Sequence, residues 1–437
     1  MRILLVAPRA REANATPAWL RIPQMSLLIL EALSGNGHHV VIVEEDADSL
    51  PLTEKWDLVG ITVMTATAPR AYALAKMFRE RGARVILGGI HPSVLPEEAS
   101  QHADAVLVGE AEAIWRSILK DAEHGSLQRI YSSLRPETIE IPLVNYKNRA
   151  MSRAPTLTPV IASRGCPNGC EFCSVPGIYG NRPRQVPISQ VIEQVQRSRG
   201  EYIAFLDDNL AATREYALEL FAALRSLKVK ILAQVSVRFI LDDELFEMAL
   251  AAGLKGIFVG FETIEERSCA RLRKLLPVHE YGIAIQKCGA AGVMLHGSFI
   301  FGLDEHDKTI FARTLDFVMR HKMFSVNANV MTPYPGTPFF DRMVSEGRLL
   351  HRNWAFYDHA TPVFQPARMT VEDLAEGYTK FRVSLLSLRG IARRLPAGMP
   401  VNLYVYFNVI AAFRRTTAEL KEHYKNYFRW LQRLEGC

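Results

Sequence analysis

The chain has 437 residues, of which 49% are apolar and 22% are charged, and its formal net charge is +6. This composition excludes a disordered chain, and the length predicts two domains plus a smaller region. The mild charge, without clustered Lys, Arg and aromatic residues, argues against nucleic acid as a partner. Pro8 ends the first apolar run, and no run reaches the roughly 18 apolar residues of a membrane helix. We therefore expect no signal peptide and a cytoplasmic location.

Residues 1–125 alternate strand and helix patterns. Buried strands separated by helices predict a parallel, doubly wound sheet (Rossmann-like, flavodoxin-like) covered on both faces. Ligands bind such sheets at the carboxyl ends of the strands. The turns at 62–65, 88–92 and 109–112 fall at these ends. The expected strands are 2–8, 39–45, 57–66, 84–91 and 105–109, and one of the helices between them is 71–81.

A second series of strands and helices begins after a predicted linker at 126–156, which lacks clean periodicity. Six strand–helix units over 157–336 predict a partial (β/α)6 barrel, whose chemistry lies on loops at the strand ends. Residues 337–437 are expected to be mostly helical. The predicted barrel strands are 159–163, 202–206, 231–237, 256–261, 294–301 and 326–331, with helices at 188–198, 215–226, 243–252 and 310–320.

Three of the six cysteines form the compact pattern Cys166-x-x-x-Cys170-x-x-Cys173 directly after the first barrel strand. Without an export signal, such a pattern indicates metal or redox chemistry rather than disulfides. Three thiolates in one loop favour zinc or an iron–sulfur centre. A closed zinc site needs a fourth ligand, and the sequence has no second short cysteine pair. A [4Fe–4S] cluster with one open iron is predicted, and a zinc site completed by a distant His or Cys is the alternative. Cys269 and Cys288 are interpreted as core residues, with a catalytic thiol as the alternative.

The run from Arg164 to Cys173 (RGCPNGCEFC) resembles the cluster motif of the radical SAM superfamily. The resemblance implies that the three cysteines hold the cluster and that its open iron binds S-adenosylmethionine (SAM). Reductive cleavage of SAM would release a 5′-deoxyadenosyl radical that abstracts hydrogen from an unactivated carbon. It also implies an external electron donor of the flavodoxin or ferredoxin type.

The same resemblance implies SAM-binding residues at the other strand ends. Phe172 would lie beside the adenine, and Glu262 would bind the ribose hydroxyls. The Asp207-Asp208-Asn209 run stands where the superfamily holds the methionine amino group, often with Gly-Gly-Glu. This departure is common in the cobalamin-dependent branch. Each acid has a structural alternative, because strand-terminal acids often cap the next helix.

The first domain, with its Gly-Gly-Ile-His-Pro turn at 88–92 and its Gly-Glu-Ala-Glu turn at 109–112, resembles the cobalamin-binding domain of the cobalamin-dependent radical SAM class. The resemblance implies that the nucleotide tail of the corrinoid inserts at the strand ends. Glycines would let the backbone approach the tail, and Thr hydroxyls would bind its phosphate or ribose. A sheet that binds no cofactor, or another nucleotide, is the alternative. The implied cobalamin-binding residues are Thr62, Thr65, Gly88, Gly89, His91 and Glu110.

The lower cobalt ligand of well-known methyl-transfer enzymes comes from an Asp-x-His-x-x-Gly motif, which is absent here. His91 is therefore interpreted either as a lower ligand or as a turn residue that hydrogen-bonds the tail. The tRNA methylthiotransferases hold a second cluster with cysteines of the N-terminal domain. No cysteine precedes Cys166, which argues against that branch.

The C-terminal segments 333–338 (PYPGTP), 354–358 (WAFYD) and 369–374 resemble the hopanoid methylase, Mg-protoporphyrin ester cyclase and bacteriochlorophyll methylase group. The resemblance implies C-methylation of a hydrophobic isoprenoid lipid or tetrapyrrole, or of a natural product. A radical cyclase, rearranging or oxygenating enzyme is one alternative, and a cobalamin-binding sensor is another. The basic, apolar tail indicates either a peripheral membrane contact or a helical cover on the barrel.

Overall fold

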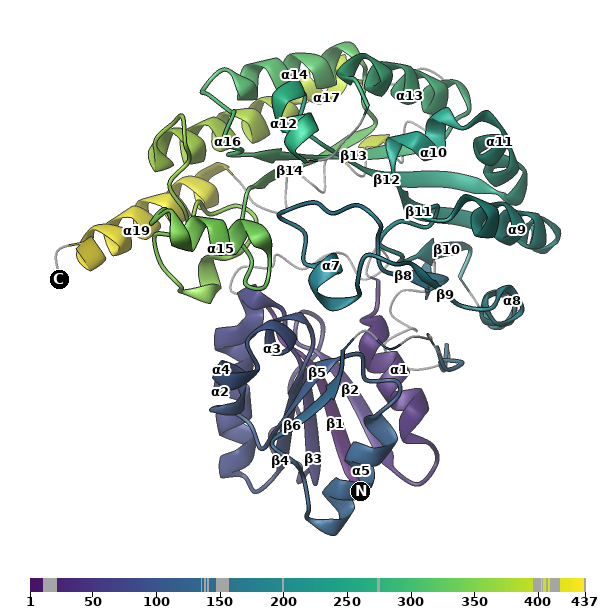
Figure 1. The fold of residues 1–437 in the computed structure, drawn as a ribbon, viewed down its shortest axis with the longest axis vertical. Helices are drawn as coiled ribbons and strands as arrows, with labels where there is room; N and C mark the ends of the chain where they lie inside the picture. The colour runs from purple at the N-terminus through teal and green to yellow at the C-terminus, as the bar shows by residue number, and fades with distance from the viewer. Residues whose placement is uncertain are drawn as a thin grey trace.

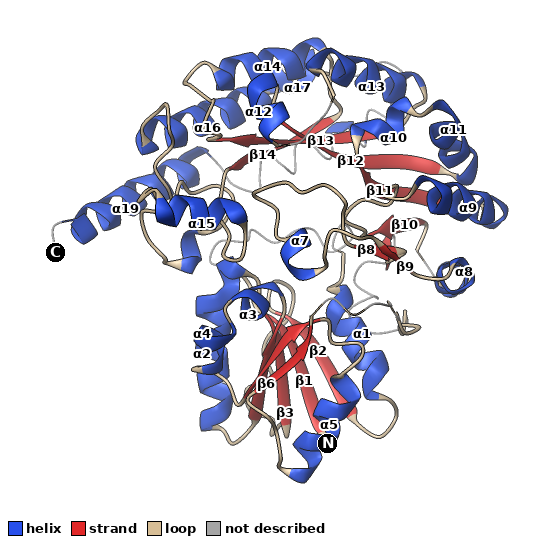
Figure 2. Cartoon of the chain, in the orientation of Figure 1, coloured by secondary structure: helices blue, strands red, loops and turns tan. Residues whose placement is uncertain are grey.

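The computed structural model describes the chain except residues 11–21, 135, 137, 138, 140, 147–156, 199, 273–275, 396–401, 403, 406, 407, 409–416, 436 and 437. Two parallel sheets stand one above the other (Figures 1 and 2). The N-terminal sheet lies below, the curved barrel sheet lies above, and a long loop with the short helix α7 (Val175–Ile178) lies between them. This loop carries the three clustered cysteines.

The N-terminal sheet has the strand order β2-β1-β3-β4-β5-β6, and all of its pairs are parallel. Buried Leu and Ile side chains of α1 and α5 pack on one face, and the buried Ala side chains, Leu74 and Phe78 of α2 pack on the other. The expected doubly wound sheet is therefore confirmed. Its elements are β1 (Arg2–Ala7), α1 (Met25–Ser34), β2 (His39–Glu44), β3 (Leu58–Thr62), η2 (Thr65–Thr67), α2 (Ala68–Glu80), β4 (Arg84–Gly88), α3 (Ile90–Val94), α4 (Pro96–Ser100), β5 (Ala105–Gly109), α5 (Trp115–His124) and β6 (Ile130–Ser133).

The sequence did not predict β6, which lies inside the segment expected to be a linker. This strand has four residues, only one of which is buried, and it forms the edge of the sheet. A short, half-exposed edge strand gives almost no hydrophobic periodicity, so its pairing with β5 becomes visible only in the folded chain.

The barrel sheet has the order β14-β13-β12-β11-β10-β7, again wholly parallel, as predicted for a six-stranded partial barrel. Its helices cover the outer, convex face (Figure 1). The strands are β7 (Leu157–Val160), β10 (Tyr202–Phe205), β11 (Lys230–Val235), β12 (Leu254–Glu262), β13 (Met294–Phe301) and β14 (Ser325–Val330), and the helices are α8 (Ile188–Arg197), α9 (Arg214–Leu224), α10 (Val237–Leu241), α11 (Asp243–Ala252), α12 (Glu266–Arg271), α13 (Val278–Ala290) and α14 (Ile310–Arg320).

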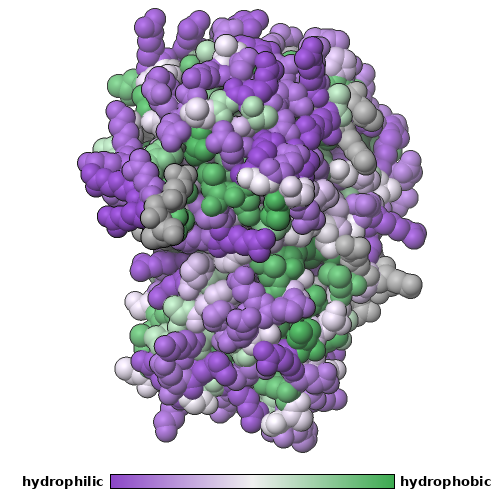
Figure 3. Space-filling view, turned by 60° about the vertical axis from the view of Figure 1, so that its left-hand side comes forward, coloured by the Kyte–Doolittle hydropathy of each residue, from purple (hydrophilic) through white to green (hydrophobic). Residues whose placement is uncertain are grey.

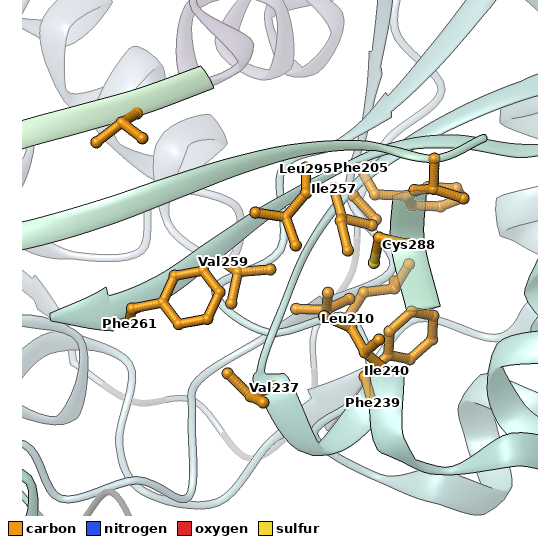
Figure 4. Packing of buried hydrophobic residues seen from close by; sticks show 14 of the residues in the cluster. Phe205, Leu210, Val237, Phe239, Ile240, Ile257, Val259, Phe261, Cys288 and Leu295 are labelled. Carbon is orange, nitrogen blue, oxygen red and sulfur yellow. The ribbon is translucent and has the colours of Figure 1, made fainter. Parts of the chain in front are cut away.

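Alternation along the strands separates a structural face from a functional face. On β12, Ile257, Val259 and Phe261 are buried under the helices and build the core shown in Figure 4. The Phe258 side chain lines a cavity on the other, concave face, and both Phe258 and Gly260 are only half-buried. Cys288 is fully buried in the convex core, in agreement with its interpretation as a core residue.

The C-terminal region is helical, as predicted, and it packs on both domains. The apolar stripe of its last helix is buried, which agrees with a helical cover. Polar side chains cover most of the face in Figure 3, and apolar ones gather near the level where the two domains meet. No described helix is long and apolar enough to cross a bilayer. The elements are α15 (Pro338–Ser345), η4 (Trp354–Phe356), α16 (Val371–Leu386), α17 (Leu388–Arg393) and α19 (Thr417–Glu435).

Candidate active site

The cysteine loop leaves the barrel after β7 and is closed at its base by a short antiparallel ladder. The ladder pairs β8 (Ser163–Arg164) with β9 (Arg184–Gln185). Residues 165–183 form the loop itself, and none of its three cysteines is in a disulfide. The backbone N–H of Cys173 donates to the carbonyl of Cys170 at 3.1 Å, which folds the two residues into one turn.

The three thiols lie in a setting that fits a bound iron–sulfur cluster. The pKa of the Cys173 thiol is raised to about 12, mainly by burial. The backbone N–H of Val175 opposes this shift, and the nearby Cys170, Asp208 and Cys166 add to it. A thiolate here therefore needs a positively charged centre, which the irons of a cluster supply. Among the described residues, no three Cys, His, Asp or Glu side chains converge closely enough to hold a single metal ion. Ligands to separate irons of one cluster do not need to converge on one point.

The two aspartates after β10 hold the base of the loop. Asp207 is almost completely buried and accepts hydrogen bonds from the Ser163 hydroxyl (2.6 Å) and the Ala162 N–H (3.1 Å). Asp208 accepts one from the N–H of Gly165 at 3.0 Å, immediately before the first cysteine. Both carboxylates thus fix the path of the chain into the cluster loop. Their contact with SAM stays a prediction.

Asn209, by contrast, lines a cavity of about 410 Å³ at the carboxyl rim of the barrel, which we call the rim cavity. Its Oδ1 atom is buried and has no hydrogen-bond partner, as expected of an amide placed to bind a ligand. Pro167 and Asn168 of the cluster loop line the same cavity, and so do Ser236 and Arg238 after β11. The sequence reasoning missed Ser236 and Arg238, although they follow a barrel strand as the predicted residues do.

Glu262 ends β12 in an uncommon conformation. Its φ of 65° is left-handed, and the register with β13 shifts between Gly260 and Glu262. Its carboxylate folds back over Gly260, where a Cβ would collide with Oε1. Gly260 lines the rim cavity, so the glycine makes room for this carboxylate beside it. Backbone strain at a strand end is typical of functional positions.

The outer part of the cluster loop is tied to the far side of the barrel. Glu171 pairs with Arg342 of α15 at 3.0 Å, and Arg342 pairs with Asp304 at 2.6 Å. The carbonyl of Glu171 also accepts from the N–H of Phe339 at 2.9 Å. The half-buried Phe172 packs against an apolar cluster that includes Leu272, Ile300 and Phe364. These contacts hold the loop at the barrel rim; the expected contact of Phe172 with adenine stays a prediction.

A second cavity, of about 110 Å³, lies at the carboxyl ends of the N-terminal strands, and we call it the sheet cavity. Four of the six predicted cobalamin-binding residues line it: Thr62, Gly88, Gly89 and Glu110. Leu27 of α1 and Trp115 of α5 give it apolar walls, which the sequence reasoning missed. Gly89 has a φ of 102°, and a Cβ there would sit 2.8 Å from the Val63 nitrogen. The cavity therefore needs glycine at this position.

Thr65 and His91 lie outside the sheet cavity. Thr65 is buried in η2. The ring of His91 is fully buried, and its Nε2 lies 3.1 Å from the Tyr72 hydroxyl and 3.3 Å from Glu98. Glu98 also accepts from the indole N–H of Trp354 at 2.9 Å, so this cluster joins the N-terminal domain to the C-terminal region. A cobalamin contact for Thr65 or His91 stays a prediction.

A third cavity, of about 430 Å³, lies on the concave face of the barrel sheet, and we call it the barrel cavity. Phe258 and His296 stack in its wall, with ring centroids 5.2 Å apart and an angle of 26° between their planes. Among the described residues that line it, none is Asp, Glu, Lys or Arg. The rim and sheet cavities both contain charged side chains.

Comparison with known proteins supports both domains. Residues 160–318 match the model of the radical SAM superfamily, and residues 22–119 match that of the B12 binding domain. A bacteriochlorophyllide d C-12(1)-methyltransferase from Chlorobaculum tepidum is 27% identical over 93% of this chain and 92% of its own length. The hopanoid C-2 methylase of Rhodopseudomonas palustris is 24% identical over 76% of this chain and 66% of its own.

Two solved structures share the arrangement of the domains. The cobalamin-dependent SAM radical enzyme OxsB matches 94% of this chain and 72% of its own with a TM-score of 0.66 at 14% identity. The radical SAM methyltransferase TsrM from Kitasatospora setae matches 79% of this chain and 78% of its own with a TM-score of 0.64 at 15% identity. The matched ranges and the shared fold confirm the predicted combination of a corrinoid domain with a radical SAM barrel. The chain belongs to the radical SAM superfamily, in the branch that carries an N-terminal B12-binding domain.

Proposed function

We propose that this protein is a cobalamin-dependent radical SAM methyltransferase that methylates an unactivated carbon of a hydrophobic substrate. The observation that carries the proposal is the position of the cysteine loop. Arg164 and Tyr179, at its base and near its end, line the sheet cavity, while Pro167 and Asn168 line the rim cavity. One loop therefore brings a cluster-binding motif next to the strand-end cavity of the N-terminal sheet and next to the barrel rim.

Different residues of the chain bind the cluster and SAM. When bound, the cluster supplies the electron that cleaves SAM, and cobalamin carries the methyl group. Cys166, Cys170 and Cys173 hold the cluster. In the rim cavity, the buried Oδ1 of Asn209 is placed to accept from the amino group of SAM. Glu262, whose carboxylate folds over the cavity-lining Gly260, is proposed to accept from the ribose hydroxyls.

Arg238 is proposed to bind the carboxylate of SAM. It is exposed in the rim cavity and makes no ion pair with any residue that the structure describes. A guanidinium binds a carboxylate with two parallel hydrogen bonds, and the Ser236 hydroxyl beside it adds a third donor.

The barrel cavity is the proposed substrate site. Its walls combine apolar side chains with Gln234 and His296. Because none of the described lining residues is Asp, Glu, Lys or Arg, a carboxylate or phosphate inside the cavity would find no counter-charge, which disfavours such a group there. A large apolar molecule with a neutral hydrogen-bonding group satisfies this lining. This fits a polycyclic isoprenoid, or a tetrapyrrole whose acidic groups lie outside the cavity. Within the cavity, exclusion of water would protect a substrate radical.

The chemistry is tested by anaerobic reconstitution with iron, sulfide and hydroxocobalamin. About four irons and one cobalt per chain are expected, with 5′-deoxyadenosine formed from SAM and a reductant. The C166A/C170A/C173A variant is expected to keep cobalt and lose both iron and this product. Incorporation of zinc in place of iron would refute the proposal.

Methyl transfer and the substrate site need separate tests. SAM with a deuterated methyl group, incubated with lipid and pigment fractions, is expected to label one product by a methyl group's mass. A product without that mass would indicate a cyclase, rearranging or oxygenating enzyme. The L232W variant fills the barrel cavity and is expected to abolish labelling, while I283W, at a residue 52% exposed on α13, should leave it unchanged.

Two further partners belong to the proposal. An external flavodoxin- or ferredoxin-type protein would supply the electrons, because the matched family reduces SAM through its cluster. A peripheral membrane contact would deliver an isoprenoid substrate. Leu388 and the adjacent Arg389 on α17 would be suited to such a contact.

A further inference from the structure

Two arginines close the base of the cluster loop and face each other across it. Arg164 and Arg184 are directly paired in the antiparallel ladder of β8 and β9. All three cysteines lie between them in the chain. Like charges at facing positions of a ladder repel one another, so this base is unstable unless anions neutralise it.

The anions come from the other domain. Arg164 pairs with Glu110 at 2.7 Å and with Glu112 at 2.5 Å. Arg184 donates to Glu110 from both terminal nitrogens, and the bond from its Nη1 to Glu110 Oε2 is 3.2 Å long. Both glutamates stand just after β5 of the N-terminal sheet. The four side chains are between 4% and 13% exposed, so solvent screens these charges poorly. We call these four residues the neck.

The neck also forms one wall of the sheet cavity. Glu110, Glu112 and Arg164 line this cavity, together with Tyr179 of the cluster loop. The Arg164 guanidinium lies 5.7 Å from the centre of the Tyr179 ring. The cavity is therefore complete only when the base of the cluster loop is docked on β5.

We propose that the neck couples the two cofactor sites, so that occupancy of the sheet cavity by a corrinoid tail orders the cluster loop and a bound cluster tightens corrinoid binding. This inference rests on the proposed function. A ligand shifts a conformational equilibrium only through contacts that differ between the two states. Arg164 and Tyr179 line the sheet cavity only when the cluster loop is docked on β5, so a ligand in the cavity contacts them in the docked state alone. The same factor must then appear in both directions. Glu110, Glu112, Arg164 and Arg184 act as positioning residues.

The test is a thermodynamic cycle on the full-length protein. The dissociation constant of hydroxocobalamin is measured by absorbance titration on cluster-loaded protein and on the C166A/C170A/C173A variant. The rate of iron loss to a chelator is measured with and without hydroxocobalamin. The wild type is expected to bind hydroxocobalamin at least fivefold more tightly when the cluster is loaded, and hydroxocobalamin is expected to slow iron loss at least fivefold.

Two variants and one control assign this effect to the neck and to the cavity wall beside it. E112Q removes one charge with little change in shape, and Y179L removes only the ring from the cavity wall; both are expected to bring the coupling factor below twofold. E193Q makes the same change as E112Q in an exposed pair with Arg197 on α8 and is expected to keep the wild-type factor.

The outcomes separate this inference from the proposed function. Uptake of both cofactors with a coupling factor near one in the wild type would overturn the coupling. So would a full factor in E112Q and Y179L, with circular dichroism spectra equal to that of the wild type. Failure of the wild type to take up iron or cobalt would instead refute the proposed function.

Discussion

Replacement of Gly89 by alanine tests the role of the sheet cavity most directly. Gly89 has φ 102° and ψ −169°, a region that is essentially restricted to glycine. An added Cβ would sit 2.8 Å from the Val63 nitrogen and 2.9 Å from its carbonyl oxygen. These two atoms bond to the Gly88 carbonyl and to the His91 N–H, so the new methyl group would push apart the ends of β3 and β4.

The conformational strain alone costs about 1–3 kcal/mol. The displaced strand ends carry Thr62 and Gly88, which line the sheet cavity. The strain is present in the free and in the bound protein alike, so the loss of affinity comes from the displaced cavity wall. We expect G89A to weaken hydroxocobalamin binding about tenfold, which corresponds to about 1.4 kcal/mol. The measurement is an anaerobic absorbance titration of the cluster-loaded protein.

Gly82 provides a matched control in the same domain. It has a φ of 86°, and an added Cβ there would meet no atom within 4 Å. G82A therefore introduces backbone strain without a collision and is expected to bind hydroxocobalamin within twofold of the wild type. If a folded G89A protein also binds within twofold, the sheet cavity is not the corrinoid site and the reasoning from its geometry is wrong.

Three further predictions concern stability, measured by urea denaturation followed by circular dichroism. Burial raises the pKa of Asp207 to about 7 against opposing hydrogen bonds from Ser163 and Ala162, so its native pKa lies above the unfolded value of 3.8. The protonated Asp207 side chain therefore adds on the order of 4 kcal/mol to the free energy of unfolding below pH 3.8, and this contribution is lost as the pH rises toward 7. D207N should remove this pH dependence, and an unchanged pH profile would contradict the raised pKa. F261A should cost about 3–5 kcal/mol, because the fully buried Phe261 ring stacks on Phe299; a loss under 1 kcal/mol would show that the convex core tolerates the cavity. T370A should cost about 1 kcal/mol, because the Thr370 hydroxyl accepts from the Asp373 N–H and caps α16; no loss would mean that water replaces the cap.

Hydrophobic periodicity in the sequence predicted most of the architecture. The bounds of β5, β13, α11 and α14 agree with those expected from the sequence, because each has a continuous apolar run or a clear helical stripe. The order of the two domains followed from the same patterns. The edge strand β6 was not predicted, because four residues with one buried side chain carry too little signal.

The candidate site was predictable where chemistry lies within one short segment. The spacing of the three cysteines indicates a cluster because all three ligands come from one loop. The roles of Asp207 and Asp208 were not accessible in this way, since their partners lie more than 40 residues away in the base of the loop. Arg238 and Trp115 were missed for the same reason, because what makes them notable is the cavity that each one lines.

The sequence by itself therefore determined the fold class, the cluster motif and the order of the domains, all of which depend on local spacing and hydrophobic pattern. Only the tertiary structure decided how the domains meet. Glu110 is separated from Arg164 by 54 residues and from Arg184 by 74, so no local pattern reports their pairing. Their contact requires the end of β5 to reach the base of the cluster loop. The physical reason is that a buried charge must find its counterion in space, and that partner is set by the packing of whole domains.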